Sequence, residues 1–288
     1  MKRTFSAWLL TVAVCLGTLF PARLWADDID VVLIGGQSNA TGQGYMRNLP
    51  VSFTPNRSVL FYHSMPLNRG AKPRTGEQWL PLHQASETAD KFGPELSLGT
   101  RLAQRFPNRK WALIKHALSG SNLYRQWNPA EGKARGPEFR LFMKTVNEGL
   151  DKLRKQGHTP HIRAMVWQQG CADARDNAPV AAAENYAKNL TVLIETVRKE
   201  TNSPEMVFVL GQVMPMAAPR FPRRDIVRAQ QKSLASKEKK IVWVPGDDLE
   251  MRRHDYRTPM PQDDVHLGTY GQLTLGERFA DAIPAPKD

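Results

Sequence analysis

The segment 35–39 (GGQSN) places a serine directly after a short apolar run at 31–34. A serine on a tight turn between a strand and a helix presents its hydroxyl at the edge of a sheet, and glycines let the backbone bend there. The backbone N–H groups of such a turn can also face an anion. Ser38 is therefore a candidate nucleophile, and the alternative is an ordinary turn whose serine caps a helix.

A second segment supplies the groups that a serine nucleophile needs. Asp263, Asp264 and His266 lie just before a predicted helix. A serine hydroxyl needs a base to take its proton, and a histidine base needs an acid that fixes its tautomer. An Asp three residues before a His can fold back onto the imidazole, so the spacing favours Asp263 over Asp264. The alternative is a surface acidic loop with a helix-capping Asp.

A third segment, 167–173 (WQQGCAD), follows the apolar run at 164–167. An uncharged amide at such a strand end could donate a hydrogen bond to the oxyanion that develops during acyl transfer. Gln169 is the candidate, and a polar loop that merely closes a strand is the alternative. No base motif accompanies Cys171, so we expect a small buried residue there rather than a nucleophile.

Apolar runs alternate with amphipathic stretches along the whole chain. The predicted strands are 31–34, 59–62, 111–114, 164–167, 207–210 and 241–244. The predicted helices are 94–106, 138–156, 180–200, 224–238 and 269–282. This alternation predicts one three-layer α/β/α domain around a central parallel sheet of about five strands. Ligands of such sheets bind beyond the carboxyl ends of the strands, where the motifs lie.

The first 26 residues have the pattern of a secretory signal peptide. Lys2 and Arg3 precede an apolar run at 7–20, and Ala26 precedes two aspartates. We therefore expect residues 1–26 to be removed and residues 27–288 to form the mature domain, secreted or periplasmic. A retained N-terminal anchor or a lipoprotein modified at Cys15 is the alternative. After cleavage only Cys171 remains, which excludes an intrachain disulfide.

The chain carries a formal net charge of +12. Such an excess attracts anionic partners, acidic glycans among them. The cations are scattered, with short clusters only at 223–224 and 237–240, and no nucleic-acid motif accompanies them. The seven histidines have no metal-ligand spacing. We expect no nucleic-acid partner, no stable membrane insertion, no metal and no organic cofactor.

Together the motifs resemble those of the SGNH hydrolases, and within them the carbohydrate esterases of the sialate O-acetylesterase and acetylxylan esterase type (carbohydrate esterase family six type). The matching segments, in order, are 36–39 (GQSN), 92–95 (FGPE), 117–123 (ALSGSNL), 167–173 and 263–266. The resemblance implies a flavodoxin-like fold and spans nearly all of residues 27–288. One departure is that Cys171 and Ala172 stand where the family usually has Glu and Ser, so a carboxylate that could organise the pocket is missing.

The resemblance also implies a role for individual residues. Ser38 would be the nucleophile, His266 the base and Asp263 its orienting acid. The oxyanion hole would use the backbone N–H groups of Ser38 and Gly93 and the side-chain amide of Gln169. Residues expected to contact the substrate are Gln37, Asn39, Ser119, Gly120 and Trp127, the last by stacking on a sugar or, alternatively, as a packing residue.

These observations predict a secreted serine esterase that removes O-acetyl groups from carbohydrates through an acyl-enzyme. The expected partner is an acetylated oligo- or polysaccharide, anionic ones included. One alternative is a non-catalytic carbohydrate-binding protein on the same fold, which would be expected to have a damaged triad. Another is a lipase or thioesterase, which would favour an apolar channel, whereas the long loops at 64–90 and 119–137 are polar and basic.

Overall fold

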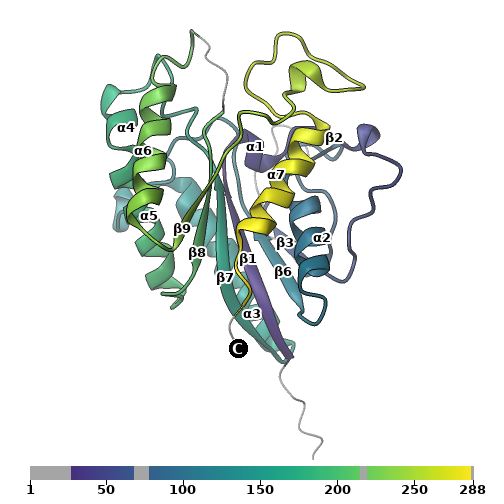
Figure 1. The fold of residues 1–288 in the computed structure, drawn as a ribbon. Coiled ribbons are helices and arrows are strands. Elements are labelled where there is room, and N and C mark those ends of the chain that lie inside the picture. The colour runs from purple at the N-terminus through teal and green to yellow at the C-terminus, as the bar shows by residue number, and fades with distance from the viewer. Residues whose placement is uncertain (1–26, 68–77, 215–218, 287–288) are drawn as a thin grey trace, which may run out of the picture.

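The computed structural model describes residues 27–67, 78–214 and 219–286, so the predicted signal peptide lies outside the described residues. A seven-stranded sheet lies between two layers of helices (Figure 1). Its strands, in spatial order, are β4 (Leu80–Pro81), β3 (Leu60–His63), β6 (Trp111–Lys115), β1 (Asp27–Gly36), β7 (His158–Gln168), β8 (Val207–Gly211) and β9 (Ile241–Val244). All neighbours are parallel except β3 and β4. The predicted α/β/α fold is confirmed, with seven strands rather than about five.

Helices cover both faces of the sheet. One face carries α1 (Ser38–Thr41), α2 (Glu95–Arg105) and α7 (Thr269–Ala282), and the other carries α3 (Pro137–Lys155), α4 (Val180–Glu184), α5 (Tyr186–Glu200) and α6 (Arg224–Lys237) (Figure 1). The predicted helix at 180–200 is two helices, because the chain leaves the helical path at Asn185. Across the described ranges, no helix is both long enough and apolar enough to cross a membrane.

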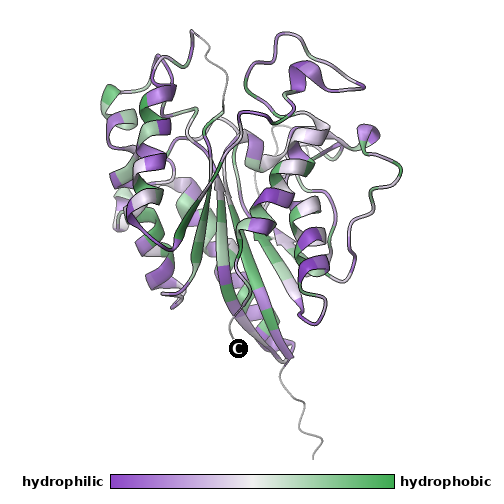
Figure 2. Ribbon diagram, in the orientation of Figure 1, coloured by the Kyte–Doolittle hydropathy of each residue, from purple (hydrophilic) through white to green (hydrophobic). Residues whose placement is uncertain are grey.

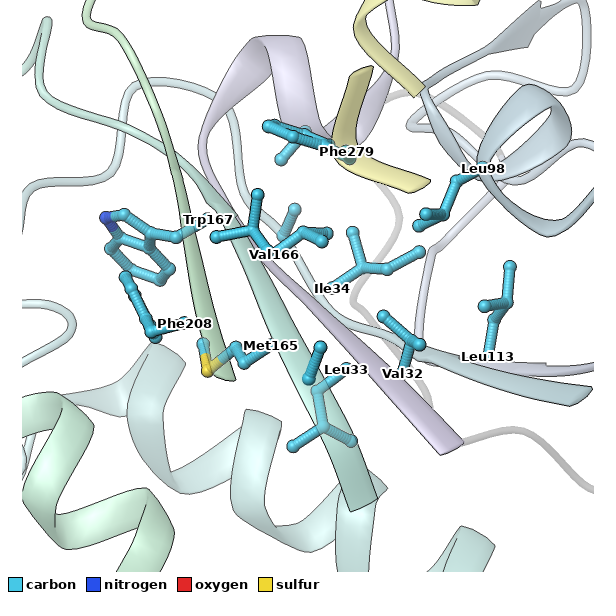
Figure 3. Close-up of a cluster of buried hydrophobic side chains, with 14 of the residues drawn as sticks. Val32, Leu33, Ile34, Leu98, Leu113, Met165, Val166, Trp167, Phe208 and Phe279 are labelled. Atoms are coloured by element: carbon cyan, nitrogen blue, oxygen red, sulfur yellow. The ribbon is translucent and has the colours of Figure 1, made fainter. Parts of the chain in front are cut away.

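The core lies on both sides of β1. Ile34 points toward Leu98 of α2 and Phe279 of α7, whereas Leu33 points to the opposite face and pairs in register with Met165 of β7 (Figure 3). All five of these side chains have no measurable exposure. The strands are hydrophobic over most of their length, with hydrophilic residues toward the beginnings of β1 and β7, and the outer helix faces are hydrophilic (Figure 2). Burying one such side chain contributes about 1.5–3 kcal/mol, which fixes β1 at the centre of the sheet.

The carboxyl ends of β6, β1 and β7 meet at one edge of the sheet. β1 lies between β6 and β7, so the chain leaves β1 toward one side and later returns on the other. A crevice at such a switch point is the usual ligand site of an open α/β sheet. A small antiparallel pair, β2 (Gly44–Tyr45) with β5 (Lys91–Phe92), follows α1 along the chain. The topology therefore brings the segments after these strands together, as the sequence predicts.

A glycine makes the sharp turn from β1 into α1 possible. Gly36 has a φ of +138°, and a Cβ there would lie 2.3 Å from the carbonyl oxygen of Gln168. Residues with a Cβ rarely adopt such a φ, and a Cβ so close to a carbonyl oxygen would clash with it. The N–H of Gln37 donates to the same carbonyl oxygen at 3.0 Å. Ser38 thus becomes the first residue of α1, at the carboxyl edge of the sheet and beside the end of β7.

Candidate active site

Ser38 lines a hollow of about 270 Å³ at the carboxyl edge of the sheet. His266 lines the same hollow from the loop before α7. Ser38 is only 3% exposed, so its hydroxyl is reached from this hollow rather than from open surface. The first N–H groups of a helix have no partner within it, and the described part of the chain provides no backbone acceptor for that of Ser38. Ser38 therefore supplies both a candidate nucleophile, its hydroxyl, and a free hydrogen-bond donor, its backbone N–H.

Asp263 holds His266 in one tautomer. Its Oδ2 lies 2.9 Å from the Nδ1 of His266, and its Oδ1 accepts the backbone N–H groups of Val265 and His266 at 3.2 and 3.0 Å. Burial by itself would raise the pKa of Asp263, but the hydrogen bonds and charge of His266 outweigh it and hold that pKa well below its usual range. Facing a carboxylate, Nδ1 carries the proton, so Nε2 is free to act as a base.

Two arginines flank this acid–base pair. Arg220 forms an ion pair with Asp264, which therefore has its own partner. Arg252 is 6% exposed, its Nη1 lies 3.5 Å from Oδ2 of Asp263, and its backbone N–H donates to the carbonyl oxygen of His266 at 2.7 Å. Asp263, which the three-residue spacing favours, is thus the carboxylate that faces His266, and Asp264 is not. No sequence pattern predicted Arg252, because it reads as one more cation of a basic stretch.

Asn39 ties the nucleophile segment to the base segment. Its Nδ2 donates to the carbonyl oxygen of Val265 at 3.1 Å, and its Oδ1 accepts the N–H of Leu267 at 2.9 Å. These two residues stand on either side of His266. The prediction that Asn39 contacts the substrate is wrong, because both ends of its buried amide are used within the protein. It fixes the relative positions of α1 and the His266 loop instead.

Gln37 links the hollow to the segment after β7. Its Oε1 accepts the N–H groups of Gly170 and Ala172, both at 3.2 Å. Gln37 also lines the hollow with Ser38. Its amide oxygen is held by two donors, so the NH₂ group is the part of this side chain that remains for a ligand. The expected contact between Gln37 and the substrate stays a prediction that this geometry permits.

The backbone N–H of Gly93 has a partner inside the protein. It donates to Oε1 of Glu95 at 2.9 Å, and Gly93 does not line the hollow. The other oxygen of Glu95 lies 2.6 Å from Nζ of Lys115, which also donates to the carbonyl oxygen of Thr41 at 3.0 Å. Burial lowers the pKa of Lys115. Gly93 as an oxyanion donor is therefore a wrong prediction, and this segment instead supports α1 through a buried ion pair.

The amide of Gln169 is also fully engaged. Its Nε2 donates to Oδ2 of Asp173 at 2.7 Å and to the carbonyl oxygen of Ser121 at 3.1 Å, while its oxygen accepts from the hydroxyl of Tyr186 at 2.9 Å. Gln169 is 1% exposed and does not line the hollow. The prediction that Gln169 stabilises the oxyanion is wrong for this arrangement. Its position at a strand end is as predicted, but it faces inward.

Asp173 anchors the long loop after β6. It accepts the backbone N–H groups of Leu123 and Tyr124 and the amide of Gln169. Burial raises the pKa of Asp173 to about 6, although these hydrogen bonds act in the opposite direction. The loop residues Ser119 and Gly120 line the hollow, as expected of substrate contacts.

Trp127 belongs to the core. It is fully buried, its Nε1 donates to Oγ of Ser121 at 2.8 Å, and its ring meets that of Trp167 edge-on at 4.9 Å. The prediction that Trp127 stacks on a sugar is wrong, and the packing alternative is right. Large aromatic side chains in loops are ambiguous in sequence because both roles need the same apolar ring.

The remaining wall of the hollow is cationic and apolar. It is formed by Cys171, Ala172, Arg175, Arg220, Phe221 and Val265. Burial raises the pKa of the Cys171 thiol to about 11, which makes a thiolate nucleophile unfavourable at neutral pH. Among residues 27–67, 78–214 and 219–286, no group of three or more His, Cys, Asp or Glu side chains could hold a metal ion. The arrangement suits acyl transfer by a serine with a histidine base.

Comparisons with known proteins point to carbohydrate esterases. A family model described as "Carbohydrate esterase, sialic acid-specific acetylesterase" matches residues 28–285. A probable carbohydrate esterase of Arabidopsis thaliana is 25% identical over 267 residues, which cover 88% of this chain and 89% of that protein.

Solved structures share the fold. The crystal structure of an Arabidopsis thaliana protein has a TM-score of 0.64 at 23% identity and covers 88% of this chain and 97% of that one. For NanS the TM-score is 0.62 at 11% identity, with 90% of this chain and 97% of that chain covered. A carbohydrate acetylesterase from Xanthomonas citri has a TM-score of 0.54 at 17% identity, with 88% and 55% covered.

Proposed function

This chain belongs to the carbohydrate esterase family whose model is described as sialic acid-specific acetylesterase, and we propose that it is a secreted serine esterase that removes O-acetyl groups from carbohydrates. The observation that carries the proposal is one hollow lined by both Ser38 and His266, with the Nδ1 of His266 held by Asp263 at 2.9 Å. The serine, the histidine and the aspartate that such a reaction needs are all present, which argues against a protein that only binds carbohydrate.

The proposed reaction is a two-step acyl transfer. Nε2 of His266 takes the proton of the Ser38 hydroxyl as its oxygen attacks the acetyl carbonyl carbon. The sugar oxygen then leaves with that proton, and the acetyl group stays on Ser38. Water, deprotonated by His266, attacks the acetyl-enzyme, and His266 returns that proton to the departing Ser38 oxygen, so that acetate and free Ser38 result.

Of the three donors that the sequence predicted, the N–H of Ser38 alone is unpaired within the described residues, so the oxyanion needs a second donor. The N–H groups of Ser38 and Gly120 are the proposed donors. Both residues line the hollow, and neither N–H has a backbone acceptor within the described ranges. Gly120 has a φ of +74°, and a Cβ there would meet nothing within 4 Å, so this stretch of backbone is open to a ligand. Donors that are already oriented stabilise the transition state without a cost in reorganisation.

The proposed substrate is an acetylated oligo- or polysaccharide, and the charges of the hollow favour an acidic one. Arg175 and Arg220 lie 5.9 and 4.9 Å from the centre of the Phe221 ring. Arg220 is paired with Asp264, whereas Arg175 has no ion-pair partner within the described ranges. A net positive hollow on a chain of charge +12 attracts anions.

Secretion is a separate part of the proposal. β1 begins at Asp27, directly after the predicted signal peptide. N-terminal sequencing of the protein recovered from the medium or the periplasm should give a start near Asp27. A chain that stays in the cytoplasm with its first residues intact would contradict secretion and leave the esterase chemistry untouched.

The function is tested by acetate release from acetylated xylan, pectin and sialosides, with an aryl acetate and an aryl octanoate as small substrates. We expect acetate from at least one carbohydrate and faster turnover of the acetate than of the octanoate. Absence of acetate release from all carbohydrates, or faster hydrolysis of the octanoate, would favour the lipase or thioesterase alternative.

A further inference from the structure

A second hollow, of about 520 Å³, adjoins the one around Ser38. The two hollows share His266 and Arg220. The rest of the second hollow is lined by residues 259–263, the segment that ends in Asp263. None of the steps described above uses this space.

The chemistry of acyl transfer places the sugar next to it. The leaving alcohol takes its proton from the base, so the sugar oxygen must lie against Nε2 of His266. The acetyl group lies on the Ser38 side of that oxygen. Sugar residues attached to the acetylated one must therefore extend away from Ser38, and the space that opens at His266 is the second hollow.

The lining of the second hollow fits a sugar ring. Pro259, Met260 and Pro261 are exposed apolar side chains, and Met260 is 39% exposed. Gln262 adds an uncharged amide and Arg220 a cation. A pyranose ring presents apolar C–H faces and a polar rim of hydroxyls, and ligand sites commonly combine apolar walls with a few polar groups in this way. An acyl chain would use only the apolar part of this lining.

The floor of the hollow is held in place. The N–H of Met260 donates to the carbonyl oxygen of Arg252 at 3.0 Å, and its own carbonyl oxygen accepts the N–H of Asp263 at 2.8 Å. The hydroxyl of Tyr45 reaches Sδ of Met260 at 3.7 Å. A fixed surface loses less entropy on binding than a mobile one. The same turn carries Asp263. The catalytic loop itself therefore sets the distance between the second hollow and the reacting atoms.

We propose that the second hollow is a subsite for the sugar residue next to the acetylated one. It follows that acetylated oligo- and polysaccharides are better substrates than acetylated monosaccharides. This inference rests on the proposed esterase function and specifies the length of its substrate.

The test compares kcat/KM for the acetylated monomer and tetramer of xylose, galacturonic acid and N-acetylneuraminic acid, and the sugar with the fastest acetate release is scored. The wild-type protein should prefer the tetramer by about tenfold or more, which corresponds to about 1.4 kcal/mol. The double variant Met260→Ser with Gln262→Ala should reduce this preference to about threefold or less, since it removes the apolar and the amide contact.

A second variant tests whether the effect of the double variant comes from a change in loop structure. Gln262→Trp keeps the contact between Tyr45 and Met260 but fills the hollow, and the preference for the tetramer should fall in the same way. The matched control is Val192→Ala, since Val192 is 44% exposed on α5 and lines neither hollow. Its tetramer-to-monomer ratio should equal that of the wild type.

Three outcomes would overturn the inference. The first is a wild-type ratio near one with acetate released from both substrates. The second is a tenfold preference that neither variant changes, which would place the neighbouring sugar elsewhere. The third is hydrolysis of an aryl octanoate that the double variant selectively slows, which would identify the hollow as an acyl site. Absence of acetate from every sugar would instead overturn the esterase proposal, and the subsite with it.

Discussion

At the scale of single residues, Asp263 and Asp264 are neighbours with different partners. Asp263 faces Nδ1 of His266, and Asp264 faces Arg220. Asp263→Asn should lower kcat by on the order of 10⁴, because an amide favours the wrong histidine tautomer. Asp264→Asn should cost less than about tenfold, since an exposed ion pair contributes about 0–1 kcal/mol. Steady-state kinetics with an aryl acetate measures both, and a larger loss from Asp264→Asn would reverse the assignment.

Gln169 is expected to matter for stability rather than for turnover. Gln169→Ala removes hydrogen bonds to Asp173, Ser121 and Tyr186. Each buried group left without a partner costs about 1–3 kcal/mol, so Tm should fall by roughly 4–10 °C. The folded variant should keep kcat within about threefold. A loss of about 10²–10³ in kcat at an unchanged Tm would instead restore the oxyanion role that the sequence predicts.

These two cases show what motif spacing can and cannot predict. The Asp263–His266 pair is local, because three residues separate its members, so the chain itself brings them together. Gln169 and Trp127 take their roles from the side of the backbone on which they lie. That depends on residues such as Tyr186 and on packing against Trp167. No residue-type pattern within the motif carries this information.

At the scale of elements, Asn39 joins α1 to the His266 loop across 226 residues of chain. Asn39→Ala should lower kcat about ten- to hundredfold, because small displacements between nucleophile and base are costly. The free energy of unfolding should fall by about 1–3 kcal/mol. Asn39→Asp keeps the acceptor for Leu267 and loses the donor to Val265, so its kcat should be intermediate. A rise in KM alone would support the substrate contact that the sequence predicts.

Asp173 should give the fold a pH dependence of its own. Burial raises its pKa to about 6 from 3.8. Above about pH 6 both states are ionised and the buried charge destabilises the fold. As pH falls from about 6 toward 4 the folded state takes up the proton first, so stability should rise, by at most about 3 kcal/mol.

Asp173→Asn should remove this contribution, and Tm measured from pH 4.5 to 7.5 for both proteins checks it. Asp263 acts in the opposite direction, because its pKa is lowered in the folded state. Its stabilisation is therefore lost only as pH falls below about 4, outside this window. Parallel Tm curves for the two proteins would show that Asp173 does not titrate as described.

At the scale of the whole molecule, the alternation of apolar runs and amphipathic stretches was enough to predict the layers. The helix at 269–282 coincides with α7. β4, β2 and β5 have two residues each, too few for any periodic signal, and were not predicted. β7 begins at His158, several residues before the predicted start at 164. The prediction missed its first half because that half is only partly buried and lacks the apolar run that marked 164–167. The second hollow depends on a loop and had no sequence signature.

The nucleophile is the central claim, and acetate release by Ser38→Ala tests it most directly. Ser38 is a small side chain without a hydrogen bond that the fold needs, so the variant should fold with an unchanged Tm. With the carbohydrate that the wild-type protein deacetylates fastest, kcat should fall by at least about 10⁴, because no oxygen remains to accept the acetyl group. A correctly folded Ser38→Ala protein that kept most of the wild-type kcat would contradict the account.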